Sequence, residues 1–196
     1  MRGTWRQWCA VLLLVETLLA SGPAVVGSVE WDTLLAGEVV VETVKHPEGF
    51  SGLRASFTVA ATREHIWAVL VDYANFPKIF PDIQKMRVLT QDQDGAQVEY
   101  WISAILAHYH YVLYRRYEGP GRRLTWTRIG GDLKRIEGSW EIRDTPRPEA
   151  HLLVYESYVD IGGVIPTALV RLEATRKARE MGERLRHWIE GHPMPE

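Results

Sequence analysis

The chain has 196 residues, of which 46% are hydrophobic and 24% are charged, a composition that fits one ordinary globular domain and excludes a disordered or collagen-like protein. Its 23 basic and 25 acidic residues give a net charge of -2, which argues against nucleic acid as a partner because duplex-binding proteins usually carry a basic excess. The single cysteine, Cys9, excludes an internal disulfide framework and a cysteine-rich metal site.

The first 27 residues predict a secretory signal peptide. Arg2 and Arg6 give a positive start, residues 9–20 form a mostly apolar run, and small residues follow. The run is shorter than the roughly 20 apolar residues that a spanning helix needs. Because Glu16 within it is costly in an export signal, the alternative is an uncleaved N-terminal anchor. We therefore expect an exported protein of the bacterial periplasm, with one domain over residues 28–196.

Eight runs rich in Val, Ile, Thr and aromatic residues lie between turn signals and predict β-strands. They cover residues 38–44, 53–60, 86–90, 97–106, 108–117, 124–129, 135–143 and 151–161. Several alternate with period two, as in 97–106, where Val98, Tyr100 and Ile102 share one face and Glu99 lies on the other. The short breaks between runs predict an antiparallel sheet with one face toward solvent.

Helical segments lie between the early strands and at the C-terminal end. Thr62 can cap a short helix over 63–71, and residues 72–80 predict a second short helix interrupted by Pro77. A long helix begins after Gly162-Gly163 and ends at Gly191. Its predicted apolar stripe consists of Leu169, Leu172, Thr175, Ala178, Met181, Leu185 and Trp188.

This order of elements predicts an α+β fold in which a curved antiparallel sheet wraps around the long C-terminal helix. The apolar face of the sheet must be covered, and about 25 residues at 1.5 Å each make this helix the one long enough to do so. A strongly twisted sheet curled around one helix leaves a gap between the two, and the residues that line the gap then determine function.

Four stretches of the sequence resemble the START-like, or SRPBCC, helix-grip superfamily, which includes polyketide cyclases and coenzyme Q-binding START-domain proteins. They are residues 61–67, 72–81, 138–140 and 165–170. The resemblance covers most of the chain beyond the signal peptide and implies the helix-grip fold. The superfamily holds enzymes, carriers and regulators on one scaffold, so it implies no single activity. It places an isoprenoid quinone among the possible ligands.

An aromatic set on the predicted inner faces indicates a pocket for an apolar ligand, because ligand pockets are mostly apolar with few polar groups. The predicted lining residues are Phe76, Phe80, Tyr100, Ile102, Tyr109, Tyr111, Trp126, Trp140, Leu169 and Leu172, with Tyr155 or Tyr158 from the last strand. The alternative is that these rings simply fill the core. We predict non-catalytic binding or transport of a lipid, an isoprenoid quinone or a polycyclic compound, with no cofactor.

Two other functions remain open. A cyclase or aromatase would need an acid or base inside the pocket, and Glu156 and Tyr111 are the candidates for that role. Glu156 points inward only if Val154 and Tyr158 do; otherwise Leu153, Tyr155 and Ser157 face the interior. A protein-interaction module on the same fold is the third interpretation, favoured if side chains fill the cavity.

Two further groups of residues are weaker candidates. His108 and His110 share one strand face and could bind zinc, but the sequence supplies no further ligands, so we expect solvated histidines and no metal. Arg115, Arg116, Arg122 and Arg123 cluster around one loop. They could make a transient contact with an anionic membrane, although such a cluster is more often a solvated hairpin.

Overall fold

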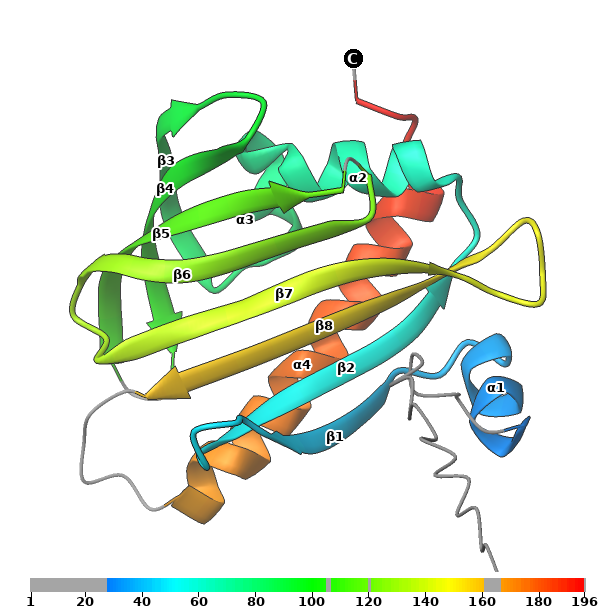
Figure 1. The fold of residues 1–196 in the computed structure, drawn as a ribbon, viewed down its shortest axis with the longest axis horizontal. Coiled ribbons are helices and arrows are strands. Elements are labelled where there is room, and N and C mark those ends of the chain that lie inside the picture. Colours follow the sequence, from blue (N-terminus) through cyan, green and yellow to red (C-terminus); the bar gives the residue numbers. More distant parts are fainter. Residues whose placement is uncertain (1–27, 105–106, 120, 161–166, 196) are drawn as a thin grey trace, which may run out of the picture.

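An eight-stranded antiparallel sheet forms the body of the protein in this computed structural model, which describes residues 28–104, 107–119, 121–160 and 167–195 (Figure 1). The predicted signal peptide lies outside these residues. The strands are β1 (Val40–Lys45), β2 (Ser51–Val59), β3 (Ile83–Gln91), β4 (Gly95–Ala104), β5 (Ala107–Glu118), β6 (Arg123–Gly131), β7 (Arg135–Asp144) and β8 (His151–Asp160). Their order across the sheet is β1-β2-β8-β7-β6-β5-β4-β3. The predicted α+β fold is confirmed.

The period-two alternation of the strands places one face of each strand in the core. In β4, Val98 and Tyr100 are buried against the main core, and in β7 Trp140 and Ile142 are buried in the same way. Tyr100 lies directly opposite Tyr111 in the register between β4 and β5. Because directly opposed residues share a face, the inner aromatic residues of neighbouring strands come together on the concave side of the sheet.

The long helix α4 (Thr167–Gly191) crosses the concave side of the sheet (Figure 1). Its second half packs tightly, with Leu185 and Ile189 buried. At Gly182 the approach is so close that a Cβ atom would lie 3.0 Å from both Phe57 Cδ1 and Val39 Cγ1. This half of α4 therefore fixes the helix against β2, and the first half is the part that can stand away from the sheet.

Three short helical elements pack beside α4, at the end of the concave side near β3. They are α2 (Arg63–Val71), the 3-10 helix η1 (Tyr73–Asn75) and α3 (Phe76–Ile79). The hydroxyl of Thr62 accepts a hydrogen bond from the His65 backbone N–H at 3.2 Å, as expected for the predicted cap. The segment over 72–80, predicted as one short helix interrupted by Pro77, forms η1 followed by α3.

Helix α1 (Ser28–Leu35), which the sequence analysis did not predict, packs on the convex side of the sheet. Leu34 is buried against Leu152 and Val154 of β8 in a small second core. The Thr58 hydroxyl donates a hydrogen bond to the Leu34 carbonyl oxygen at 2.8 Å. The convex side is therefore apolar where α1 covers it.

Across the described part of the chain, no helix combines the length and apolar character needed to span a membrane.

Candidate functional site

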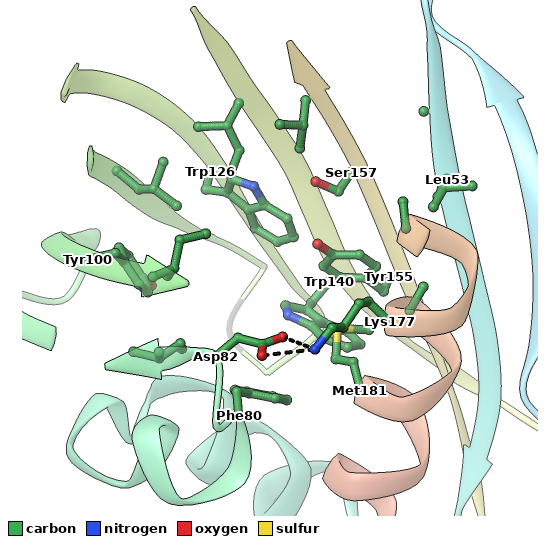
Figure 2. A pocket seen from close by; sticks show the side chains of 18 of the residues that line it. Leu53, Phe80, Asp82, Tyr100, Trp126, Trp140, Tyr155, Ser157, Lys177 and Met181 are labelled. Carbon is green, nitrogen blue, oxygen red and sulfur yellow. Dashed lines mark hydrogen bonds and ion pairs between the residues drawn. The ribbon is translucent and has the colours of Figure 1, made fainter. Parts of the chain in front are cut away.

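A cavity of about 540 Å³ lies between the concave side of the sheet, the first half of α4 and the segment from α3 to the start of β3 (Figure 2). Its volume is within the range of small-molecule sites, roughly 300–1,000 Å³. The cavity exists because α4 presents small side chains, Ala174 and Ala178, where it passes the aromatic wall of the sheet. The gap expected between helix and sheet is therefore present.

Stacked rings form the wall of the cavity on the sheet side. Trp126 and Tyr155 are stacked with centroids 5.5 Å apart, and Tyr155 also lies 4.8 Å from Trp140. Tyr100 and Tyr111 stack at 5.3 Å. These ring contacts hold the side chains in place, so a planar or extended apolar molecule would meet a preformed surface.

An ion pair lies at the edge of the cavity (Figure 2). The Lys177 ammonium on α4 is 2.9 Å from Asp82 Oδ1 and 2.7 Å from Asp82 Oδ2, just before β3. Both side chains are more than a third exposed, so the pair contributes at most about 1 kcal/mol to stability. The pair links α4 to the segment before β3 at the edge of the cavity, and this link is weak.

A buried arginine, Arg115 on β5, also lines the cavity. It is 4% exposed, and its Nη1 donates a hydrogen bond to the Tyr100 hydroxyl at 2.9 Å. The prediction that Arg115 belongs to an exposed basic cluster is therefore wrong. The alternation of β5 turns Arg115 to the same side as Tyr111 and Leu113, whereas its neighbour Arg116 is exposed.

Eight of the residues predicted to contact a ligand line this cavity. They are Phe76, Phe80, Tyr100, Ile102, Tyr111, Trp126, Trp140 and Tyr155. Their contact with a ligand stays a prediction, but the structure brings them together from α3, the turn after it and five strands. Of the two tyrosines left open on β8, Tyr155 faces the cavity and Tyr158 does not.

Two other predicted residues, Leu172 and Tyr109, do not line the cavity. Leu172 is 71% exposed on the outer side of α4, so its predicted place in the pocket is wrong. Tyr109 lies opposite Ile102 in the register but packs against the core beyond the cavity. The side chain of Leu169 lies outside the described residues.

The carboxylate of Glu156 lies on the convex side of the sheet. Tyr155 and Ser157 line the cavity, so alternation along β8 turns Glu156 away. Its Oε2 accepts a hydrogen bond from Arg54 Nε at 2.9 Å and its Oε1 accepts one from the Tyr158 hydroxyl at 2.7 Å. The inward orientation that an acid–base role required is therefore wrong, and Glu156 is part of a surface ion pair.

Tyr111 does line the cavity, but as a protonated phenol. Burial raises the pKa of Tyr111 above its ordinary value, and the neighbouring phenols of Tyr100 and Tyr155 raise it further. At neutral pH this side chain can donate a hydrogen bond to a bound molecule, whereas it is a poor general base.

The two histidines of β5 lie on the convex side. His108 is exposed, and His110 stacks on Trp101 with its Nε2 2.8 Å from Glu99 Oε1. In the described ranges, no group of three His, Cys, Asp or Glu side chains is placed to hold a metal ion.

Several lining residues were missed by the sequence analysis, chiefly Leu113, Arg115, Met181 and the Asp82–Lys177 pair. Leu113 and Arg115 follow Tyr111 at period two on β5, so the alternation itself could have identified them. No sequence signal places Asp82 beside Lys177, which is 95 residues away along the chain.

Comparison with known proteins identifies related sequences and folds. The sequence model of the family described as polyketide cyclase / dehydrase and lipid transport matches residues 59–186. No curated protein matches the chain.

Three solved structures illustrate the shared fold. The STAR-related lipid transfer protein from Xanthomonas axonopodis is 17% identical, with a TM-score of 0.64 over 77% of this chain and 93% of that one. The Zhui aromatase/cyclase from Streptomyces sp. R1128 is 18% identical, with a TM-score of 0.60 over 77% and 94%. Human StAR-related lipid transfer protein 5 is 15% identical, with a TM-score of 0.63 over 79% and 83%.

Proposed function

The chain belongs to the polyketide cyclase / dehydrase and lipid transport family, within the START-like superfamily, and from this premise we propose that it binds a hydrophobic small molecule in its cavity without catalysis. The observation that carries the proposal is the cavity of about 540 Å³ walled by stacked rings. Transfer of apolar surface from water into such a site contributes roughly 25 cal/mol per Å². A lipid, an isoprenoid quinone or a polycyclic compound would satisfy this chemistry.

Binding is favoured over the cyclase alternative by the charges around the cavity. Of the lining residues that the structure describes, Asp82 is the one carboxylate, and it lies at the edge in an ion pair with Lys177. Glu156 faces the other way, and Tyr111 holds its proton. A void of this size also speaks against a module whose cavity is filled by its own side chains.

A titration with Nile red, a neutral lipophilic dye, tests the proposal. We expect saturable binding of one dye per chain, because the aromatic cavity offers one continuous apolar volume. The measurement is the blue shift and enhancement of the dye's emission. Folded protein that gives no saturable signal would contradict the proposal.

We further propose that the protein is exported and acts in the periplasm, supported by the charged start and apolar run of the first 27 residues. N-terminal sequencing of protein from the periplasmic fraction is expected to begin after Ala24 or Gly27. A chain that keeps Met1 and stays in the cytoplasm would contradict export. Transient membrane contact during delivery would use the exposed Arg116 and Arg122.

A further inference from the structure

The guanidinium group of Arg115 is an unusual feature in an apolar cavity. The side chain projects from the second half of β5 and is 4% exposed. It lies directly opposite Trp126 in the register between β5 and β6, and both residues line the cavity. A charge taken out of water in this way is costly unless it is paired and fully hydrogen-bonded.

The neighbours of Arg115 compensate for this burial only in part. Its guanidinium carbon lies 4.9 Å from the ring centroid of Tyr73, 5.2 Å from that of Phe76 and 5.8 Å from that of Trp126. These are favourable cation–π distances. The remaining contact is the hydrogen bond from Nη1 to the Tyr100 hydroxyl, a neutral acceptor.

One edge of the guanidinium lacks partners altogether. Nε and Nη2 are buried and make no hydrogen bond, and Arg115 forms no ion pair with any carboxylate of the described residues. The N–H bonds of these two nitrogens run parallel, the arrangement that donates one hydrogen bond to each oxygen of a carboxylate. By contrast, Lys177 at the cavity edge already has its carboxylate in Asp82.

We infer that the molecule bound in the cavity carries an acidic oxygen group, with a carboxylate as the best fit, which is held by the free edge of Arg115 and by the Tyr100 hydroxyl. The apolar part then lies along Trp126, Tyr155 and Trp140 toward α4. Nε and Nη2 are buried, so holding the acid requires the Arg115 side chain to rotate this edge toward the cavity. This inference rests on the proposed function and names its ligand class.

Matched pairs of acid and ester test the inference. The probes are cis-parinaric acid and its methyl ester for an acyl chain, and 1-pyrenebutyric acid and its methyl ester for a polycyclic molecule. At about pH 8, where carboxylic acids are ionised, we expect the protein to bind at least one acid about tenfold or more tightly than its ester. The pair with the larger ratio identifies which apolar body the ligand has.

Substitutions on β5 distinguish the contribution of the Arg115 charge from that of the apolar cavity to ligand binding. Arg115→Met keeps an unbranched side chain in place of the arginine stem and removes the guanidinium group with its charge, so it is expected to abolish the acid preference while ester binding is kept. Arg116→Met, one residue along and exposed on the opposite face, is the matched control and is expected to leave both affinities unchanged. Circular dichroism verifies that both variants fold.

The possible results distinguish this inference from the proposed function. Equal binding of acid and ester by the wild-type protein in both pairs would overturn the inference of an acidic ligand and would indicate a neutral apolar ligand. This comparison uses the wild-type protein alone, so it does not depend on the folding of a variant. An acid preference that persists in Arg115→Met would also overturn it. If neither pair nor Nile red binds, the proposed function fails and the inference fails with it.

Discussion

Replacing Ala178 with phenylalanine is expected to weaken Nile red binding roughly twentyfold. Ala178 lines the cavity from α4, where its small side chain leaves the space open opposite the aromatic wall. The six carbons of a phenyl ring there would displace about six ligand atoms, each worth about 0.3 kcal/mol for a ligand of this size, a total of about 1.8 kcal/mol. Fluorescence titration of the variant measures the loss.

The matched control is Arg179→Phe, which adds the same ring to the exposed side of the same helix. It is expected to bind the dye as the wild-type protein does. Because the ring of Ala178→Phe enters an existing void, we also expect no loss of thermal stability. Undiminished binding by a folded Ala178→Phe variant would show that the dye sits elsewhere.

Replacing Phe57 with alanine is expected to lower the free energy of unfolding by about 3–5 kcal/mol. Phe57 is fully buried on β2, packs edge-on against Trp140 with centroids 6.2 Å apart, and lies under Gly182 of α4. Its loss would leave a void at the place where the helix is fixed to the sheet. Urea denaturation followed by circular dichroism measures the change.

Phe50→Ala provides the comparison for this measurement. Phe50 precedes β2, is only half-buried and stacks on His46 at 4.1 Å. Its removal is expected to cost about 1 kcal/mol, as for a typical substitution outside the core. Equal losses at Phe57 and Phe50 would mean that α4 is not fixed to the sheet at this point.

The strands and helix α2 could be predicted because their signals are local. Thr62 and the apolar residues after it define α2 as Arg63–Val71, which is the range expected from the sequence. The alternation in residues 135–143 places Trp140 and Ile142 inside, as the structure does. Helix α1 gave no such signal, because eight residues packed on a small core show little periodicity.

The inner face of β8 could not be decided from its sequence. Leu152, Leu153 and Val154 are all buried, because α1 covers the convex side while the main core covers the other. Two-sided burial removes the contrast on which a period-two pattern depends. Which of Tyr155 and Glu156 faces inward therefore depends on the elements that cover the two sides of the sheet, which the sequence of β8 alone does not reveal.

The error at Leu172 has a geometric cause. Its predicted stripe advanced by repeated steps of three residues, from Leu172 to Thr175 to Ala178. With 3.6 residues per turn, each such step falls about 60° short of a full turn, so two steps carry a side chain about 120° around the helix. The buried face is instead set by Ala178, Leu185 and Ile189, which leaves Leu172 in solvent.

The error at Arg115 has a different cause: the cluster of neighbouring arginines was given more weight than the alternation of side chains along β5. Its position next to Arg116 suggested a surface cluster, whereas the alternation from Tyr111 through Leu113 placed it inside. A single charge on an otherwise apolar strand face is the kind of inconsistency that accompanies function. The pattern could have identified this residue, but not the absence of a carboxylate beside it.

Mass spectrometry of an organic extract tests the central claim most directly, when the protein is purified without denaturation from the organism that encodes it. We predict one hydrophobic compound near one molecule per chain in the wild-type extract, and its depletion from the Ala178→Phe variant prepared in the same way. The claim that the cavity holds a ligand would be contradicted if no compound is more abundant in the wild-type extract than in the variant extract and the folded wild-type protein also binds no lipophilic dye.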